Sequence, residues 1–175
     1  MTGFFSRLLS GVPKGFTGRL DRDEAVAASA EVRGGGFLVA TSLGLWVPGD
    51  DGPRRIGWHL VSKAAWAAGV FTITEADEAE QAGAAVVLVD RPPIRVAVEA
   101  PGKLPQAVHR RVTGSIRSRH HRELPGGGAW FVQRKVPGRD GTVLQVRPDE
   151  GTELDVVRAI AHDVAEKMGQ GLAES

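Results

Sequence analysis

The stretch that most constrains the fold of this chain is residues 36–75, where apolar runs of β-forming residues alternate with turn signals. Apolar runs at 37–41 and 43–47 are followed by a Pro-Gly-Asp-Asp-Gly-Pro turn, and a further apolar run occupies 70–75. Strands joined by such short connections bury their apolar faces most simply as an antiparallel meander. The sequence therefore predicts an antiparallel sheet at the centre of the fold.

Neighbouring residues extend this sheet. Residues 24–33 alternate small apolar and polar side chains with a period of two, which predicts a first strand. The triple glycine at 34–36 is expected to be a hairpin connection and not a phosphate-binding loop, because neither a helix start nor a GK[ST] sequence follows it. Residues 54–66 begin as another strand, with Trp58 on the side that faces the core.

At this point the order of elements resembles a known family. An apolar strand with a Thr, a Leu-Gly-Leu-Trp strand, a turn, Arg-Arg-Ile-Gly-Trp-His-Leu and then Gly-Val-Phe-Thr-Ile-Thr is similar to the bacterial PH-like domains over about residues 24–75. The high use of Ala, Gly, Arg and Val is also similar to that of uncharacterised actinobacterial proteins. The resemblance implies a strongly curved antiparallel sheet or partly open barrel capped by a C-terminal helix. It does not imply an enzyme.

Beyond residue 75 the pattern is less regular. The predicted elements are an acidic loop at 75–83, strands at 86–89 and 94–98, a basic amphipathic helix at 105–118, a basic loop at 119–128, strands at 129–136 and 142–147, and a helix at 153–168. Apolar residues at every fourth position from Leu104 to Ile116 indicate the first helix. Thr152 and Asp155 resemble a capping box for the second, and Gly169 is expected to end it.

Length and composition fit one soluble α+β domain. A chain of 175 residues can bury a core without disulfides, and the absence of cysteine excludes disulfides, thiolate metal sites and a cysteine nucleophile. No apolar run reaches the roughly 18–20 residues that span a bilayer. We expect a single PH-like domain over 20–175 in the cytoplasm. A short amphipathic segment precedes it at 1–19, and residues 1–16 are predicted to pack on the domain, on a partner or on a membrane surface.

The charge layout is more informative than the net charge of +1. Residues 103–147 contain ten lysines and arginines against Glu123 and Asp140, whereas the preceding residues 72–100 are acidic. Clustered guanidinium groups favour phosphate, anionic lipid or an acidic protein face. The alternative is that the acidic stretches of the same chain neutralise the basic segment.

From this layout the sequence predicts a non-catalytic interaction module without a cofactor. Its expected partner is an acidic protein or an anionic surface, and self-association into a homo-oligomer is also compatible with the resemblance. The candidate partner-binding residues are Arg110, Arg111, Arg117, Arg119 and Arg122. A nucleic-acid-binding protein using the same arginines is an alternative from another class.

The enzyme alternative is a hydrolase-like protein built on scattered histidines. His59 or the adjacent His120 and His121 would then act as general bases near neutral pH. No G-x-S-x-G elbow, HExxH, Walker loop or G-x-G-x-x-G fingerprint supports this alternative. Adjacent side chains in an extended loop diverge, so His120 and His121 do not predict a metal site either.

Overall fold

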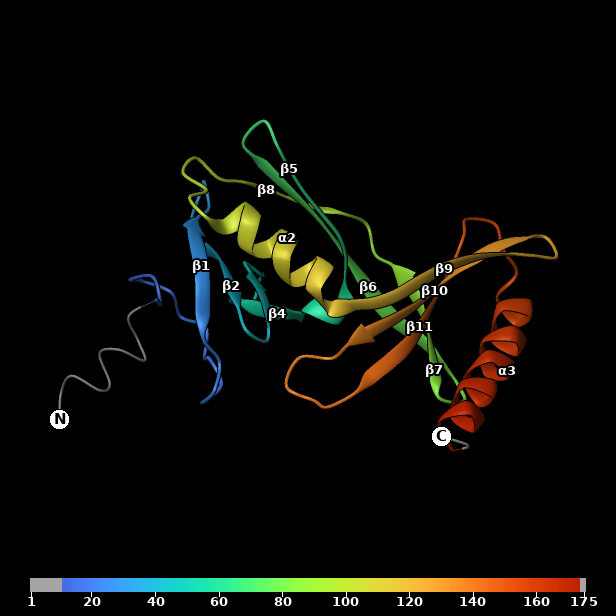
Figure 1. Cartoon of the computed structure of the whole chain (residues 1–175). Helices are drawn as coiled ribbons and strands as arrows, with labels where there is room; N and C mark the ends of the chain where they lie inside the picture. Colours follow the sequence, from blue (N-terminus) through green and yellow to red (C-terminus); the bar gives the residue numbers. More distant parts are fainter. Residues whose placement is uncertain (1–10, 174–175) are drawn as a thin grey trace. The chain divides into compact units, whose positions relative to one another are not determined.

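The computed structural model describes residues 11–173, which divide into two compact units (Figure 1). The first unit contains the chain up to Glu75 together with Pro92–Thr113, and the second contains Ala76–Arg91 and the chain from Gly114 onwards. Each unit has its own apolar core. A compact unit need not fold alone, so the expectation of one domain over 20–175 stays a prediction. Most of the predicted N-terminal helix falls on residues 1–10, outside the described residues.

The first unit begins with an antiparallel sheet of order β1-β2-β3-β4. Its strands are β1 (Val26–Glu31), β2 (Phe37–Thr41), β3 (Gly44–Val47) and β4 (Arg54–Gly57). The β1–β2 hairpin turns through three glycines that all have positive φ, between 85° and 120°. Side chains rarely adopt this backbone conformation, which explains the triple glycine and confirms the predicted hairpin.

The rest of the first unit surrounds this sheet's apolar face. Its elements are the 3₁₀ turn η1 (Trp58–Leu60), β5 (Val61–Ala67), the first part of β6 (Val70–Ala82), β8 (Ile94–Ala97) and α2 (Leu104–Ser115). β6 pairs with both β5 and β8. The core joins residues of both sheets to Leu104 and Val108 of α2. Trp58 is 2% exposed and donates its indole N–H to the Thr41 carbonyl at 2.8 Å, which confirms that it faces the core.

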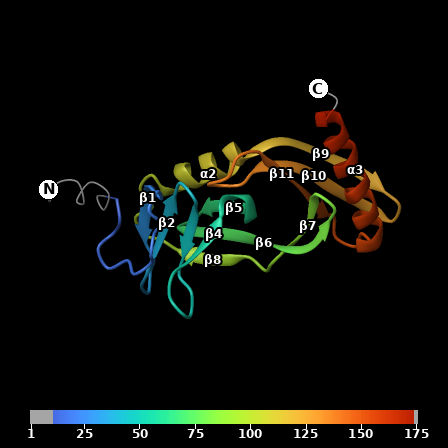
Figure 2. The same ribbon diagram turned by 90° about the horizontal axis from the view of Figure 1, so that it is seen from below.

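The second unit is one sheet covered on one face by a helix (Figure 2). The strand order runs from β6 through β7 (Ala85–Asp90), β11 (Thr142–Pro148) and β10 (Gly127–Lys135) to β9 (Ile116–Leu124). Only the β7–β11 pairing is parallel. Helix α3 (Leu154–Ala173) contributes Val157, Ala161 and Ala165 to a core that includes Phe131 and Val146 of the sheet.

The observed class is therefore α+β, with curled and mostly antiparallel sheets and, within residues 11–173, two α-helices. Two predicted loops are wrong. Residues 75–83 belong to strand β6, and residues 119–128 lie mainly in β9 and β10. In both cases the backbone pairs with a neighbouring strand, and most of the charged side chains are exposed or half-buried, Glu75 being buried, so polarity did not indicate a loop.

The structure differs from the predicted elements in four further places. The strand predicted over 54–66 is interrupted by η1, and the helix predicted over 105–118 ends at Ser115, where β9 begins. Helix α3 continues past Gly169 to Ala173. Thr152 does not cap α3, because its hydroxyl accepts from the Gly128 N–H at 3.1 Å and donates to the Gly128 carbonyl at 3.0 Å. Across residues 11–173 no helix is both long and apolar enough to cross a membrane.

Candidate functional site

Strand β9 carries three of the five predicted site residues and ends the strand order of its sheet. Among the described strands it pairs with β10 alone, and a two-residue turn at Pro125 and Gly126 joins the two strands. Arg117, Arg119 and Arg122 are all exposed. The basic stretch is thus an edge strand, and its arginines project from a regular backbone.

One face of β9 places the side chains of Arg119 and His121 against Trp130 of β10. The guanidinium carbon of Arg119 lies 4.1 Å from the centroid of the Trp130 ring. The ring of His121 meets the same indole edge-on, with centroids 5.0 Å apart. A guanidinium stacked on an indole is attracted by the ring quadrupole and keeps its N–H groups at the rim, where they can bind an anion. Arg119 is therefore held in position before any partner arrives.

The opposite face of β9 carries Arg122. Its guanidinium carbon lies 5.9 Å from the centroid of the Phe131 ring, which is 6% exposed and belongs to the core under α3. Arg117 lies at an irregularity of the β9–β10 register, between the pairs made by Ser118 and Ile116. The basic side chains of β9 therefore occupy both faces of the strand.

Several acidic residues of the second unit pair with partners other than the arginines of β9. The pairs are Asp77–Arg91, Glu80–Arg158, Asp90–Arg147 and Asp149–His121. Within residues 11–173, no carboxylate lies within ion-pair distance of Arg117, Arg119 or Arg122. The predicted alternative, in which acidic stretches of the same chain neutralise the basic segment, is not met at these three side chains.

The other two predicted residues lie on helix α2. Leu104 and Val108 turn into the core of the first unit, and Arg110 and Arg111 are exposed on the outer side of the helix. These two arginines belong to the first unit, whereas those of β9 belong to the second. The predicted five-residue face is therefore described as two surfaces, and the β9 surface is the better defined.

A further arginine of the basic segment is structural. Arg134 is 4% exposed, and its Nε and Nη2 donate to the Ser115 hydroxyl at 3.0 and 2.8 Å. Burial, together with the positive charge of Arg147, lowers the pKa of Arg134 to about 10. Arg134 thus ties the start of β9 to β10 and is not part of the exposed surface.

The histidines that carry the enzyme alternative are divided between the two units. His120 and His121 are neighbours on β9 and project to opposite faces, as adjacent strand residues do. The Nε2 of His121 lies 2.6 Å from Asp149 Oδ2, a contact that the sequence did not indicate. His59 lies in η1 of the first unit. In the part of the chain that the structure describes, no three His, Asp or Glu residues are placed to hold a metal ion.

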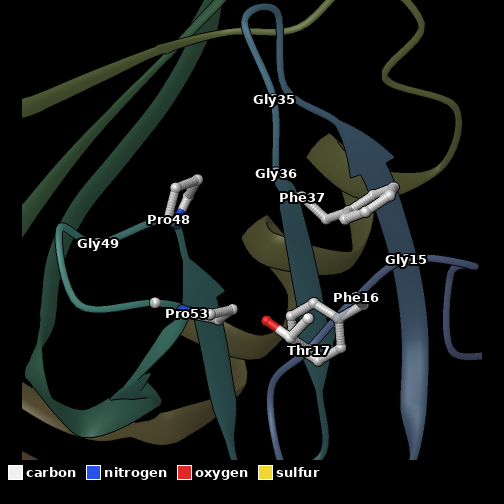
Figure 3. A pocket seen from close by; sticks show the side chains of 10 residues that line it. Gly15, Phe16, Thr17, Gly35, Gly36, Phe37, Pro48, Gly49 and Pro53 are labelled. Carbon is white, nitrogen blue, oxygen red and sulfur yellow. The ribbon is translucent and has the colours of Figure 1, made fainter.

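A pocket of about 260 Å³ lies in the first unit, at the end of the β1–β4 sheet (Figure 3). Phe16 and Phe37 stand on one side of it and Pro48 and Pro53 on the other, with glycines between them. Phe16 also packs edge-on against Trp46, at 5.6 Å between centroids. The side chains that line it are apolar apart from that of Thr17 and include none of the histidines, so the pocket gives no support to a hydrolase-like site.

Comparison with protein-family models, with curated proteins and with solved structures finds no match for this chain. The resemblance to bacterial PH-like domains thus stands on the sequence pattern of residues 24–75. The candidate site is defined by its own geometry: an exposed basic edge strand with one guanidinium stacked on an indole.

Proposed function

We propose that this protein is a non-catalytic interaction module that binds an acidic segment of a partner protein through strand β9. The observation that carries the proposal is that Arg117, Arg119 and Arg122 are exposed and form no ion pair with any residue in 11–173, while Asp77, Asp90 and Glu80 pair with other arginines. Exposed guanidinium groups form strong, charge-assisted hydrogen bonds with carboxylates. No cofactor takes part in this activity.

Two further properties belong to the same proposal. The PH-like fold of residues 24–75 is supported by the strand, turn and Ile-x-Trp order of the sequence and by the antiparallel β1–β4 sheet. A cytoplasmic location is in keeping with a chain that contains no cysteine. In this setting β9 of the second unit serves as the binding element.

An acidic protein fits β9 better than nucleic acid does. Non-specific single-strand binders offer bases several exposed aromatic rings along a basic groove. On β9 and β10 the two rings near the arginines are Trp130, whose face is covered by Arg119, and Phe131, which is buried. Carboxylates need only the guanidinium rims, which remain exposed.

The experiment measures binding of fluorescein-labelled poly-glutamate to the full chain by fluorescence anisotropy, in low and physiological salt. We expect binding that weakens steeply with salt, because exposed charge pairs are screened. The double reversal Arg119→Glu with Arg122→Glu should weaken binding by at least about tenfold, the effect of about 1.4 kcal/mol.

The matched control is Arg33→Glu with Arg95→Glu. Both residues are exposed in the first unit and make no ion pair with any residue in 11–173, and the double variant changes the net charge equally. The control should retain most of the affinity. Equal loss in the two double variants would mean that net charge alone governs binding, and the β9 site would be abandoned.

A further inference from the structure

The backbone of β9 has an outer edge whose orientation follows from its register. Leu124 and Gly127 flank the two-residue turn and pair directly. The closing pair of such a hairpin exchanges both of its backbone hydrogen bonds, and the pairs then alternate along an antiparallel ladder. His121 is paired with Trp130, and Arg119 is paired with Val132. By this alternation the backbone N–H and C=O groups of His121 and Arg119 point away from β10.

By the same alternation the backbone N–H and C=O groups of Glu123 also point outward. The corresponding groups of Ser118, His120 and Arg122 point toward β10. The outer edge is therefore lined by the N–H and C=O groups of alternate residues. Such an edge is a template for one more strand. The side chains of its outward-pointing residues share the face that carries Trp130.

We infer that the acidic partner segment binds in an extended conformation and adds to β9 as a further, antiparallel strand of the sheet. This inference rests on the function proposed above and specifies how the partner is held. Main-chain hydrogen bonds to Arg119, His121 and Glu123 supply affinity, and alternate side chains of the added strand supply specificity. Carboxylates at every second position lie on the Trp130 face, where they reach the stacked guanidinium of Arg119.

Charge decides between the two occupants that could pair with this edge. A second copy of β9 would bring together two strands that each carry Arg117, Arg119 and Arg122 against the single carboxylate of Glu123, and this excess of like charge on neighbouring strands is destabilising. Positive side chains on an edge strand thus act against self-pairing. An acidic strand instead opposes the net positive charge of β9, so the excess of arginine that disfavours a second copy favours an acidic partner.

The test uses the full chain and the capped peptide Ac-TEVEVET-NH₂. Two derivatives of this peptide each carry two N-methyl groups on the backbone. The first is methylated at the two valines, and the second is methylated at the second and third glutamates. The two derivatives have the same charge and the same number of methyl groups. They differ in which backbone N–H donors are lost, those of the valines or those of the glutamates. Because directly paired strand residues share a face, glutamates on the Trp130 face must donate their own N–H groups to β9.

The glutamate-methylated peptide should therefore bind at least about tenfold more weakly than the unmodified one, and the valine-methylated peptide should bind nearly as well as the unmodified one. Equal affinities for the two derivatives, or tighter binding of the glutamate-methylated one, would overturn strand addition on this face. Anisotropy titrations of labelled peptides provide the measurement.

Amide hydrogen exchange of the protein gives an independent result. With the unmodified peptide, exchange at Arg119, His121 and Glu123 should slow by about tenfold or more, because these amides become hydrogen-bonded. Exchange at His120 and Arg122, already paired with β10, should change little. Unchanged exchange at all five positions under saturating peptide would also overturn the inference.

The two proposals fail in different ways. If neither poly-glutamate nor the peptide binds the wild type at low salt, the proposed function is wrong and strand addition falls with it. If both ligands bind and Arg119→Glu removes binding, but the two derivatives bind equally and no amide is protected, the acidic partner stands and only strand addition is wrong.

Discussion

At the scale of single residues, Glu24 shows how a charged side chain can organise an apolar unit. Its side chain is fully buried, and its carboxylate accepts hydrogen bonds from Thr41 Oγ1 at 2.5 Å, Trp46 Nε1 at 2.9 Å and the backbone N–H of Asp21 at 2.9 Å. Arg55 completes the set at 2.6 Å. A buried charge is tolerated when its hydrogen bonds are satisfied in this way. Removing one partner leaves the other charged group buried without compensation and so destabilises the fold.

Replacing Glu24 by Gln should therefore destabilise the protein by about 3–5 kcal/mol, since it leaves Arg55 partly buried without its best partner. The matched control is Asp21→Asn. Asp21 contacts the same guanidinium at 3.2 Å, but its side chain is 62% exposed, so we expect a loss below about 1 kcal/mol. Urea unfolding of both variants at pH 7 measures the difference. Similar losses would show that the buried network is not the source of stability.

The same variant has a defined pH dependence. Burial alone would raise the pKa of Glu24, but the hydrogen bonds from Thr41, Asp21 and Trp46 and the charge of Arg55 together lower it below its ordinary value of 4.5. A carboxyl whose pKa is lower in the folded state stabilises the fold above pH 4.5, and this contribution is lost as the pH falls through the folded-state pKa. The gap between wild type and Glu24→Gln should therefore be constant above about pH 5.5 and narrow below pH 4.5. A gap that widens in acid would contradict this assignment.

At the scale of elements, the local pattern of apolar runs, period-two alternation and turn signals was sufficient for most strands. It predicted β1, β2, β3, β7, β10 and β11 to within a few residues. It failed for the acidic half of β6 and for β9, because the pairing that makes these segments strands comes from residues far along the chain. One signal was present for β9: the Pro125-Gly126 turn and the alternating strand after it require a strand before it.

The candidate site was predictable to a similar extent. The clustered charges identified the arginines, but not that Arg119 stacks on Trp130 or that Arg134 is buried. Both facts depend on cross-strand register, which the local pattern does not contain. The grouping of all five arginines into one face also assumed a continuous helix and loop, whereas α2 ends at Ser115 and β9 begins at Ile116.

Limited proteolysis with a glutamate-specific protease tests the reassignment of the acidic segment. A loop at 75–83 would be cut early, because extended, mobile loops fit protease active sites. In strand β6 the bonds after Glu75, Glu78 and Glu80 should resist cleavage under native conditions. The bond after Glu150, in the exposed turn before α3, is the internal control and should be cut first. Equally fast cleavage at Glu78 and Glu150, read by mass spectrometry, would contradict the strand.

At the scale of the whole molecule, the net charge of +1 conceals a separation of signs. Carboxylates of the second unit are used in pairs with Arg91, Arg147 and Arg158, and this leaves the arginines of β9 exposed. Attraction of an acidic partner thus depends on which cations are paired and not on their total number. Because Arg110 and Arg111 lie in the other unit, the two basic surfaces can be tested separately.

The last prediction compares these two surfaces against three polyanions. Arg117→Glu with Arg119→Glu alters β9, and Arg110→Glu with Arg111→Glu alters α2 by the same charge. With poly-glutamate we expect the β9 variant to lose at least about tenfold in affinity and the α2 variant much less, because only β9 offers both guanidinium groups and an open strand edge. Duplex DNA and anionic vesicles should bind the wild type more weakly than poly-glutamate does at physiological salt, since neither can pair with the backbone of β9.

Both variants should melt within about 2–3 °C of wild type, because exposed charges contribute little to stability. Tightest binding to DNA, with an equal loss in both variants, would instead favour the nucleic-acid alternative. A large fall in the melting temperature of the β9 variant would show that its arginines stabilise the fold and not a complex.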